Sequence, residues 1–251
     1  STLMNRSCRL CHGSDLVELF DAGALPVFHR LLLSRDGEEE RFRFQLSLCR
    51  GCSLVQVCEP VDPELLYRYY NYNFSSWKAE PHRPDEIETI LAHIRPRRVF
   101  EIGCNEGLFM HELREHSPLS GVGIEPNPVS GHMARERGFT VISEMISPSV
   151  CERVVAEHGR FDLVVSRQVV EHVHDLDSYF ECIKMVLAPG GMIFVDTPDS
   201  EPAFRVGDAS VLREEHCSYF TESVFTGLLR RHGFEPFAIR KHNFSGGTLA
   251  M

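Results

Sequence analysis

The feature that most constrains the fold is a short apolar run that closes on an acidic residue and leads into a turn with two glycines. Residues 98–102 read Arg-Val-Phe-Glu-Ile, and Gly103 and Gly107 lie in the turn that follows. Residues 108–113 then repeat apolar side chains at helical spacing. We therefore predict a strand, a tight turn and a helix beginning near Glu106, with backbone N–H groups open to a ligand at the turn.

The turn does not fit a dinucleotide, because Gly103 has no glycine two residues later. Glu101 and Glu106 would repel a pyrophosphate but attract the ammonium and sulfonium groups of S-adenosylmethionine. A second apolar run ends on Glu125, about 20 positions further on, where a strand-end carboxylate can hold ribose hydroxyls. The sequence thus predicts a site for this methyl donor. The residues expected to form it are Glu101, Gly103, Asn105, Gly107, Glu125, Pro126, Ser166 and Gln168.

Strands and helices alternate along most of the chain, which is the pattern of a parallel sheet with crossover helices. Strands are expected at 121–124, 140–142, 161–166, 192–195 and 234–240, and helices at 84–94, 129–138, 149–158, 177–187 and 222–232. A Pro-Gly-Gly turn at 189–191 is expected to separate a helix from the next strand. The predicted fold class is α/β, with a Rossmann-like sheet of the class I methyltransferase type and a small N-terminal zinc-binding domain.

Four of the nine cysteines form two pairs with a two-residue spacer, Cys8 with Cys11 and Cys49 with Cys52. This spacing lets both sulfurs of a pair point at one ion, and four thiolates complete the tetrahedral shell of zinc. A full shell leaves no position open for substrate, so the zinc is expected to be structural.

Other residues near the pairs have less specific interpretations. Gly13 and Gly51 are expected to form the tight turns of the two knuckles, and a strand over 42–48 leads into the second knuckle. His12 and His29 are possible substitute ligands, although a lone histidine is more often a surface or core residue. Cys58 is expected to be a spare thiol.

A tyrosine-rich stretch follows the zinc-binding segment. Residues 65–77 contain four tyrosines and the only tryptophan of the chain. They suit either a hinge between domains or a lid over a substrate, since tyrosine offers a flat face with a polar tip. The expected domains are therefore a zinc-binding domain at 1–60, a linker or lid with a helix at 61–95, and the donor-binding domain at 96–251.

The charge and hydropathy of the chain limit the kinds of partner that it is expected to bind. The formal net charge of -10 opposes docking on a phosphate backbone, so a small-molecule substrate is favoured over a nucleic acid. The sequence has neither an apolar run near 18 residues nor a signal-like start. A soluble, cytoplasmic protein without a membrane partner is the expectation.

A second chemically informative stretch reads Glu-His-Cys-Ser-Tyr-Phe-Thr at 215–221. Glu215 can orient or charge His216, and a histidine can act as a base near neutral pH. The plainer alternative is that both residues help Thr221 cap the following helix. His172 lies just beyond a predicted strand end, where such folds place ligands.

Taken together, these motifs resemble the zinc-containing sugar C-methyltransferases, which methylate a carbon next to a ketone in a nucleotide-linked deoxysugar. The resemblance covers nearly the whole chain and rests on the paired cysteines, the tyrosine-rich stretch, the turns at 101–107 and 123–127, Val-Val-Glu-His-Val at 169–173, and the 215–221 motif. It implies a catalytic group near the reacting carbon. The members of that group would be His216, Glu215, His172, Tyr72 and Tyr70.

Two departures from this family affect the expected acceptor. Arg213 stands where family members usually carry a tyrosine. An inward-pointing Arg213 would favour an acidic or keto-acid acceptor, and a solvent-facing one an uncharged ketone or sugar. Family members also continue beyond the Gly-Gly at 246–247 into another α/β domain, so we expect the sequence to be part of a larger biosynthetic enzyme or a short relative.

The expected reaction is methyl transfer from S-adenosylmethionine to a carbon adjacent to a carbonyl, in natural-product or deoxysugar biosynthesis. The first alternative is an O-methyltransferase of a small natural product. A second is a non-catalytic cofactor-binding module that lacks a substrate domain. A third, an RNA methyltransferase with a zinc-knuckle reader, is disfavoured by the acidic charge balance.

Overall fold

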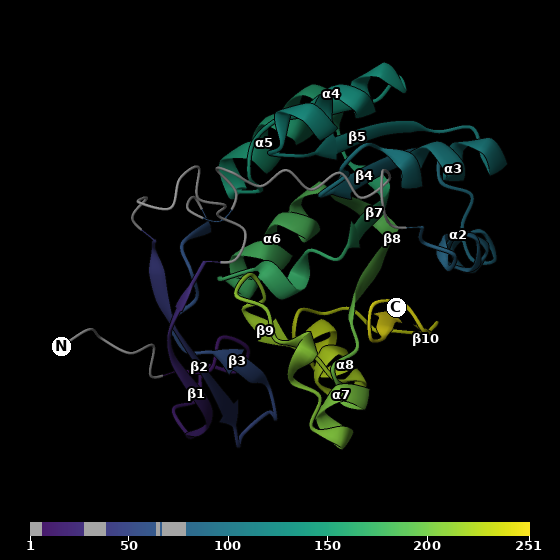
Figure 1. The fold of residues 1–251 in the computed structure, drawn as a ribbon. Helices are drawn as coiled ribbons and strands as arrows, with labels where there is room; N and C mark the ends of the chain where they lie inside the picture. Colours follow the sequence, from purple (N-terminus) through teal and green to yellow (C-terminus); the bar gives the residue numbers. More distant parts are fainter. Residues whose placement is uncertain (1–6, 28–38, 64–65, 67–78) are drawn as a thin grey trace. The chain divides into compact units, whose positions relative to one another are not determined.

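The computed structural model describes residues 7–27, 39–63, 66 and 79–251 (Figure 1). The chain divides into two compact units. Unit 1 comprises 1–71, 171–176 and 198–235, and unit 2 comprises 72–170, 177–197 and 236–251. The 215–221 motif therefore belongs to the same unit as the paired cysteines.

Unit 2 is organised around a seven-stranded sheet with the order β10-β11-β8-β7-β4-β5-β6. Its strands are β4 (Arg98–Ile102), β5 (Ser120–Ile124), β6 (Thr140–Ile142), β7 (Phe161–Arg167), β8 (Leu187–Pro198), β10 (Arg240–His242) and β11 (Thr248–Ala250). The strands from β4 to β8 pair in parallel, while β10 and β11 pair antiparallel. The predicted α/β class with a parallel central sheet is confirmed.

The helices of unit 2 begin where the sequence carries start signals. They are α2 (Arg83–Leu91), α3 (Leu108–His116), α4 (Pro128–Glu136), α5 (Pro148–His158) and α6 (Leu176–Val186). Proline occupies the first turn of α2, α4 and α5, where its missing N–H costs nothing. Asn127 caps α4, since its side-chain oxygen accepts hydrogen bonds from the N–H groups of Val129 and Ser130.

The core of unit 2 forms where strands and helices bury their apolar faces. Phe109, Met110 and Leu113 lie on one face of α3 and are all at most 2% exposed. They belong to the same buried cluster as Val99 of β4 and Val165 of β7. Burying side chains of this size stabilises the fold by roughly 1.5–3 kcal/mol each.

Two predicted details of unit 2 are wrong. Residues 234–239 form no strand, and β10 begins only at Arg240. Pro236 has no N–H to donate to a ladder, and Phe237 is 63% exposed and contacts the ring of His93 instead of a neighbouring strand. The Pro-Gly-Gly turn also lies within β8 rather than before it, as a register shift against β7 in which Gly190 has a φ of 75°.

Unit 1 contains a four-stranded antiparallel sheet with the order β1-β2-β3-β9. Its strands are β1 (Leu16–Pro26), β2 (Arg41–Cys49), β3 (Val55–Val57) and β9 (Ser218–Tyr219). Strand β9 comes from the 215–221 motif and pairs with β3, so that Ser218 lies opposite Gln56. Unit 1 also includes α7 (Glu201–Val206), α8 (Glu222–Arg231) and the 3₁₀ turn η3 (Ala209–Val211); a second 3₁₀ turn, η2 (Val170–His172), begins at the last residue of a unit 2 segment and continues into unit 1.

Across the described ranges, none of the helices combines the length and the apolar character that crossing a bilayer requires.

Candidate donor site, zinc site and histidine pair

The turn after β4 has the left-handed glycines that its sequence suggests, but the prediction of open N–H groups is wrong for most of it. The N–H groups of Gly103 and Cys104 donate to the oxygen of Ile124, and that of Gly107 donates to the oxygen of Cys104. Gly103 and Gly107 have φ values of 70° and 72°, and Gly107 is the N-cap of α3. A Cβ on Gly103 would come within 2.7 Å of a methyl carbon of Val169. Asn105, between the glycines, is also left-handed, with a φ of 47°. The turn therefore keeps this conformation and its close packing only while both glycines are kept.

Glu125 joins this turn to the end of β5. Its Oε2 accepts a hydrogen bond from the Asn105 N–H at 2.9 Å, and its Oε1 accepts one from the Asn127 N–H at 2.8 Å. Burial raises the pKa of the Glu125 carboxyl. Pro126 lies between the two contacts and is exposed. The two predicted donor motifs thus meet in the structure through one carboxylate.

Two buried acceptors beside the turn fit a cationic ligand. Oε2 of Glu101 and Oδ1 of Asn105 have no hydrogen-bond partner in the described part of the chain. Burial raises the pKa of Glu101 to about 8. A buried acceptor without a donor is costly, and the ammonium group of S-adenosylmethionine would supply one. The residues present therefore fit this donor.

Ser166 and Gln168 flank the end of β7 and behave differently. The Ser166 side chain is 1% exposed, and its hydroxyl bonds to the Tyr179 hydroxyl, which leaves mainly its backbone for a ligand. Gln168 is left-handed, with a φ of 53°, and both its N–H and its side-chain Nε2 donate to Oδ1 of Asp196. Their expected contacts with the donor remain predictions.

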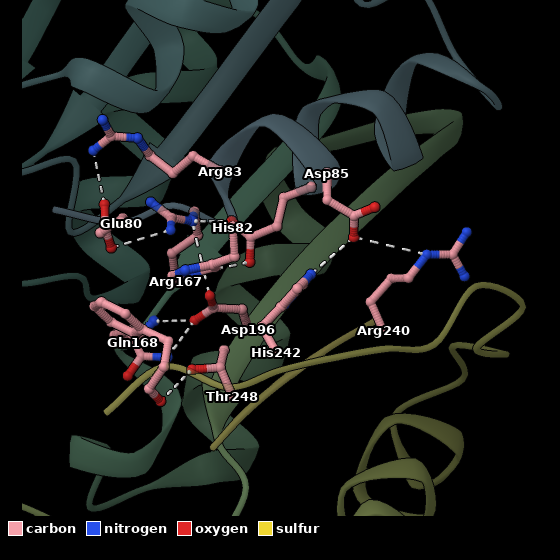
Figure 2. Close-up of polar contacts among 12 residues, drawn as sticks. Glu80, His82, Arg83, Asp85, Arg167, Gln168, Asp196, Arg240, His242 and Thr248 are labelled. Carbon is pink, nitrogen blue, oxygen red and sulfur yellow. Dashed lines mark hydrogen bonds and ion pairs between the residues drawn. The ribbon is translucent and has the colours of Figure 1, made fainter. Parts of the chain in front are cut away.

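The sequence analysis missed a buried ionic cluster at the same strand ends (Figure 2). Arg167 donates from Nε to Oε2 of Glu86 at 2.9 Å and from Nη2 to Oε1 of Glu80 at 3.2 Å. Its guanidinium carbon also lies 4.6 Å from the ring centre of Phe109. Asp196, at the end of the adjacent strand β8, is 3.9 Å from Arg167 Nε. The sequence did contain a signal for this cluster: Arg167 and Asp196 each follow directly after the apolar run of a predicted strand, where such folds place ligands.

Burial is the largest single influence on each pKa value in this cluster, and the charges of neighbouring groups come next. Burial alone would lower the pKa of Arg167, but Glu86, Asp196 and Glu80 together raise it. Burial raises the pKa of Glu86 to about 9, an effect that Arg167 only partly offsets. For His82, burial lowers the pKa and Arg167 lowers it further, so the imidazole is neutral near pH 7. Arg167 is thus the cation around which the carboxyl groups pack.

In unit 1, the two cysteine pairs meet as predicted. Sγ of Cys8 lies 3.5 Å from Sγ of Cys52, and Sγ of Cys11 lies 3.5 Å from Sγ of Cys49. All four sulfurs lie within 4.8 Å of one another. Zinc–sulfur bonds of about 2.3 Å in a tetrahedron need sulfurs roughly 3.8 Å apart, so the donor set fits zinc.

The knuckle turns differ from the expectation in one respect. The left-handed residues are His12 and Ser53, with φ values of 62° and 65°, and each directly follows the second cysteine of its pair. Gly13 and Gly51 are not left-handed. A Cβ on Gly13 would lie only 3.3 Å from Sγ of Cys11, so Gly13 leaves room for sulfur, whereas a Cβ on Gly51 would lie 3.6 Å from Sγ of Cys49, an ordinary contact. The ligand set includes neither His12 nor Cys58, and His29 lies outside the described residues.

His172 and His216 lie together in unit 1, with ring centres 4.9 Å apart and planes at 81°. Nδ1 of His172 lies 3.0 Å from the backbone oxygen of Glu215. Because a carbonyl oxygen only accepts, this nitrogen carries a proton. In a neutral His172 the Nε2 atom is therefore a proton acceptor, and it donates only when the ring is protonated.

Each histidine has a carboxylate nearby. Oε1 of Glu171 is 3.7 Å from Nε2 of His172, and Oε1 of Glu215 is 3.9 Å from Nε2 of His216. These separations suit ion pairs but are too long for hydrogen bonds. Glu215 thus contacts His172 through its backbone and influences His216 by charge. The sequence analysis did not single out Glu171, whose side chain is 2% exposed.

The remaining predicted residues have mixed outcomes. Tyr70 and Tyr72 lie outside the described residues. The Arg213 side chain is exposed, while its backbone N–H and oxygen both bond to the Tyr219 hydroxyl. An acidic or keto-acid acceptor was expected only if Arg213 pointed inward, and this condition is not met. Thr221 is the N-cap residue of α8, but its side chain makes no capping hydrogen bond.

These features define a class of protein. Residues 72–239 match the family described as "Methyltransferase domain", and the chain belongs to this family of S-adenosylmethionine-dependent enzymes. Residues 8–67 match the family described as "Putative zinc binding domain", in agreement with the convergent cysteines.

Individual relatives add detail. The chain is 26% identical to C-methyltransferase NovU of Streptomyces niveus over 97% of its own length and 59% of that protein. It is 35% identical to the mitochondrial ubiquinone biosynthesis O-methyltransferase of Homo sapiens, over 40% of its own length and 28% of the human protein. The chain thus spans less than two thirds of either relative. A Burkholderia thailandensis 1,6-didemethyltoxoflavin-N1-methyltransferase shares the fold, with a TM-score of 0.57 at 17% identity over 92% of this chain and 97% of that one.

The zinc site yields a first prediction. Cys8→Ser or Cys52→Ser removes one of the four thiolates, and structural zinc sites contribute folding energy directly. We expect loss of zinc and unfolding of the zinc-binding segment, with S-adenosylhomocysteine binding by unit 2 largely retained. Metal analysis and calorimetry measure both effects. Cys58→Ser is the matched control, and a wild-type protein purified without chelator that contains no zinc would contradict the assignment.

The donor site yields a second prediction. Glu125→Ala should weaken S-adenosylhomocysteine binding by roughly 1.5–3 kcal/mol, because ribose hydroxyls would lose a charged acceptor. The substitution also removes the acceptor of the Asn105 and Asn127 N–H groups, so the measured loss of affinity includes any change in the turn that they support. Titration calorimetry gives the dissociation constant, with exposed Glu136→Ala as the control. An unchanged constant would mean that the ribose is held elsewhere.

The buried carboxyls yield a third prediction, on pH. Burial holds the pKa of Glu101 at about 8 and of Glu86 at about 9, above their ordinary value of 4.5. Below pH 4.5 both states bind these protons, and between 4.5 and the folded pKa only the folded state does. Stability therefore falls as pH rises from about 4.5 to 8 for Glu101 and from about 4.5 to 9 for Glu86, by up to about 1.4 kcal/mol per pH unit for each group.

Glu101→Gln keeps the shape of the side chain but removes its titration. We expect the fall in unfolding free energy between pH 6 and 8, measured by denaturant titration without donor, to be shallower by roughly 1 kcal/mol per pH unit. Exposed Glu157→Gln should leave the slope unchanged. Identical slopes for Glu101→Gln and wild type would show that Glu101 is already ionised at pH 6.

Proposed function

We propose that this chain catalyses methyl transfer from S-adenosylmethionine to a carbon next to a carbonyl group, in natural-product or deoxysugar biosynthesis. The observation that carries the proposal is the histidine pair: His172 and His216 lie within ring contact and each has a carboxylate nearby. O-methylation of an acidic hydroxyl needs less assistance with proton removal than C-methylation. The similarity to a C-methyltransferase along 97% of the chain supports the same reaction.

The proton step is assigned to unit 1. His216 accepts the α-proton from the acceptor, and the negative charge moves to the carbonyl oxygen as an enolate. The carboxylate of Glu215 favours the imidazolium that results. Protonated His172 can donate from Nε2 to the enolate oxygen, because its Nδ1–H is already directed at Glu215 and Glu171 stabilises its positive charge.

The methyl step is assigned to unit 2. Glu101, Asn105 and the glycine turn would hold the methionine part of the donor, and Glu125 the ribose. When bound, the donor supplies an electrophilic methyl group, which forms a bond to the enolate carbon while its bond to sulfur breaks and the sulfonium becomes a thioether. The protein's remaining contribution is to position the reactants and exclude water.

The exposure of Arg213 is the observation that bears on the acceptor class. With Arg213 exposed, an uncharged ketone or a keto-sugar is the better candidate than a keto acid. The net charge of -10 also favours a small molecule over a nucleic acid.

O-methylation of a small natural product is the alternative. It is supported by the local similarity to ubiquinone biosynthesis O-methyltransferases, which reaches 35% identity over 105 residues. This similarity covers 40% of the chain, and it carries no information on proton removal from carbon.

Deuterium exchange separates the two reactions. The wild-type protein is incubated in D₂O with a nucleoside-diphosphate-linked keto-deoxysugar but no methyl donor. We expect exchange at the carbon next to the ketone, and a loss of roughly 10²–10⁴-fold in its rate for His216→Gln, the range for a general base. His132→Gln, which alters an exposed histidine, is the control. Product that carries the methyl on oxygen, with no exchange in wild type, would support the alternative.

A further inference from the structure

The two cysteine pairs share a detail that zinc binding does not explain. Both read Cys-Arg-x-Cys, with Arg9 in the first and Arg50 in the second. Arg50 is exposed, as expected for an arginine on a knuckle, whereas Arg9 is only 8% exposed. Burying a guanidinium costs free energy unless its donors are satisfied, so the contacts of Arg9 need an explanation.

Arg9 extends from the knuckle across β3 to the start of the 215–221 motif. Its Nη1 donates to the backbone oxygen of Cys217, and its Nη2 donates to the backbone oxygen of Val57 at 3.1 Å. Its own N–H donates to Oε1 of Gln56 at 2.9 Å. Both ends of Arg9 are therefore fixed, one by the knuckle and β3 and the other by Cys217.

Cys217 connects these contacts to the histidines. Its oxygen also accepts from the Val57 N–H at 3.0 Å, and its N–H donates to the oxygen of Glu171 at 2.7 Å. Its Sγ donates to the oxygen of His172 at 3.4 Å. The residue directly before it is His216. Cys217 thus supports both histidines, His172 through its Sγ and His216 through the peptide bond, and the guanidinium of Arg9 holds its carbonyl oxygen.

We propose that Arg9 is a positioning residue through which the zinc knuckle sets the geometry of the His172–His216 pair. With zinc bound, Cys8 and Cys11 would fix the backbone on both sides of Arg9, and its guanidinium then holds the Cys217 carbonyl. This inference rests on the proposed function, which gives His172 and His216 their roles in catalysis. It gives the metal a role in the reaction without any contact between metal and substrate.

The matched variants are Arg9→Met, which keeps the length of the side chain without its donors, and Arg50→Met at the same position of the other knuckle. Amide exchange at Val57 and Cys217 reports the supporting contacts. Imidazole NMR signals of His172 and His216, assigned with His→Gln variants, report the pair and its titration. Zinc content and S-adenosylhomocysteine affinity report the integrity of the two units.

We expect Arg9→Met to keep one zinc per chain and to bind S-adenosylhomocysteine within twofold of wild type. Exchange at Val57 and Cys217 should rise at least tenfold, and the imidazole signals and their titration midpoints should shift. Arg9→Lys, which keeps a charge and some donors, should restore these properties in part, and Arg50→Met should match wild type. If the keto-deoxysugar is accepted, kcat should fall about tenfold with little change in KM.

Unchanged exchange and unchanged imidazole signals in Arg9→Met would overturn the proposal. So would loss of zinc from both Arg9→Met and Arg9→Lys, because Arg9 would then only hold the knuckle together. If Arg9→Met alone loses zinc, the exchange and NMR results of Arg9→Lys decide. Failure of the proposed function is separate: it appears as absent deuterium exchange into the acceptor with wild-type protein, whatever the Arg9 variants show.

Discussion

A buried guanidinium holds together the strand ends on which the donor site depends. Arg167, at the end of β7, pairs with Glu80 and with Glu86 of α2, and Asp196 of β8 lies close by. Removing one partner of such a group costs roughly 3–5 kcal/mol, because the remaining charge stays buried and unpaired. Asp196 also accepts two hydrogen bonds from Gln168 and so holds that residue in its left-handed conformation. The cluster therefore couples the placement of α2 to the backbone of the loop after β7.

The same part of unit 2 carries more carboxyl groups than its cations balance. In the structure without ligand, burial favours the protonated forms of Glu86 and Glu101. A positively charged donor would stabilise the ionised form of Glu101, whose Oε2 lacks a partner among the described residues. The fold thus maintains acceptors that are unfavourable alone and would be favourable with a cationic ligand, which is why these residues are the proposed donor site.

Local sequence was sufficient for most of unit 2 and for the metal ligands. The turn at 103–107 needs left-handed glycines, Glu125 needs only to follow a buried strand, and a two-residue spacer determines how paired cysteines point. Local sequence failed where partners distant in the chain decide the outcome. Strand β9 is two residues long and exists because β3 pairs with it, and Arg167 appears as a mere surface arginine until Glu86 is placed beside it. The failed strand at 234–240 shows the converse, since residues 234–239 have the apolar side chains of a strand but join no ladder of the described sheets.

Chain topology explains how two histidines 44 positions apart in sequence come to share one unit. Strands β7 and β8 are neighbours in the sheet, and each is followed at its carboxyl end by a segment of unit 1, 171–176 after β7 and 198–235 after β8. His172 is carried by the first segment and His216 by the second. Parallel α/β sheets place ligand-binding loops at carboxyl ends. In this chain the loop after β8 also supplies β9, the fourth strand of the unit 1 sheet, and Cys217, whose carbonyl oxygen accepts from Arg9, so the segment that bears the proposed base is paired with the N-terminal strands.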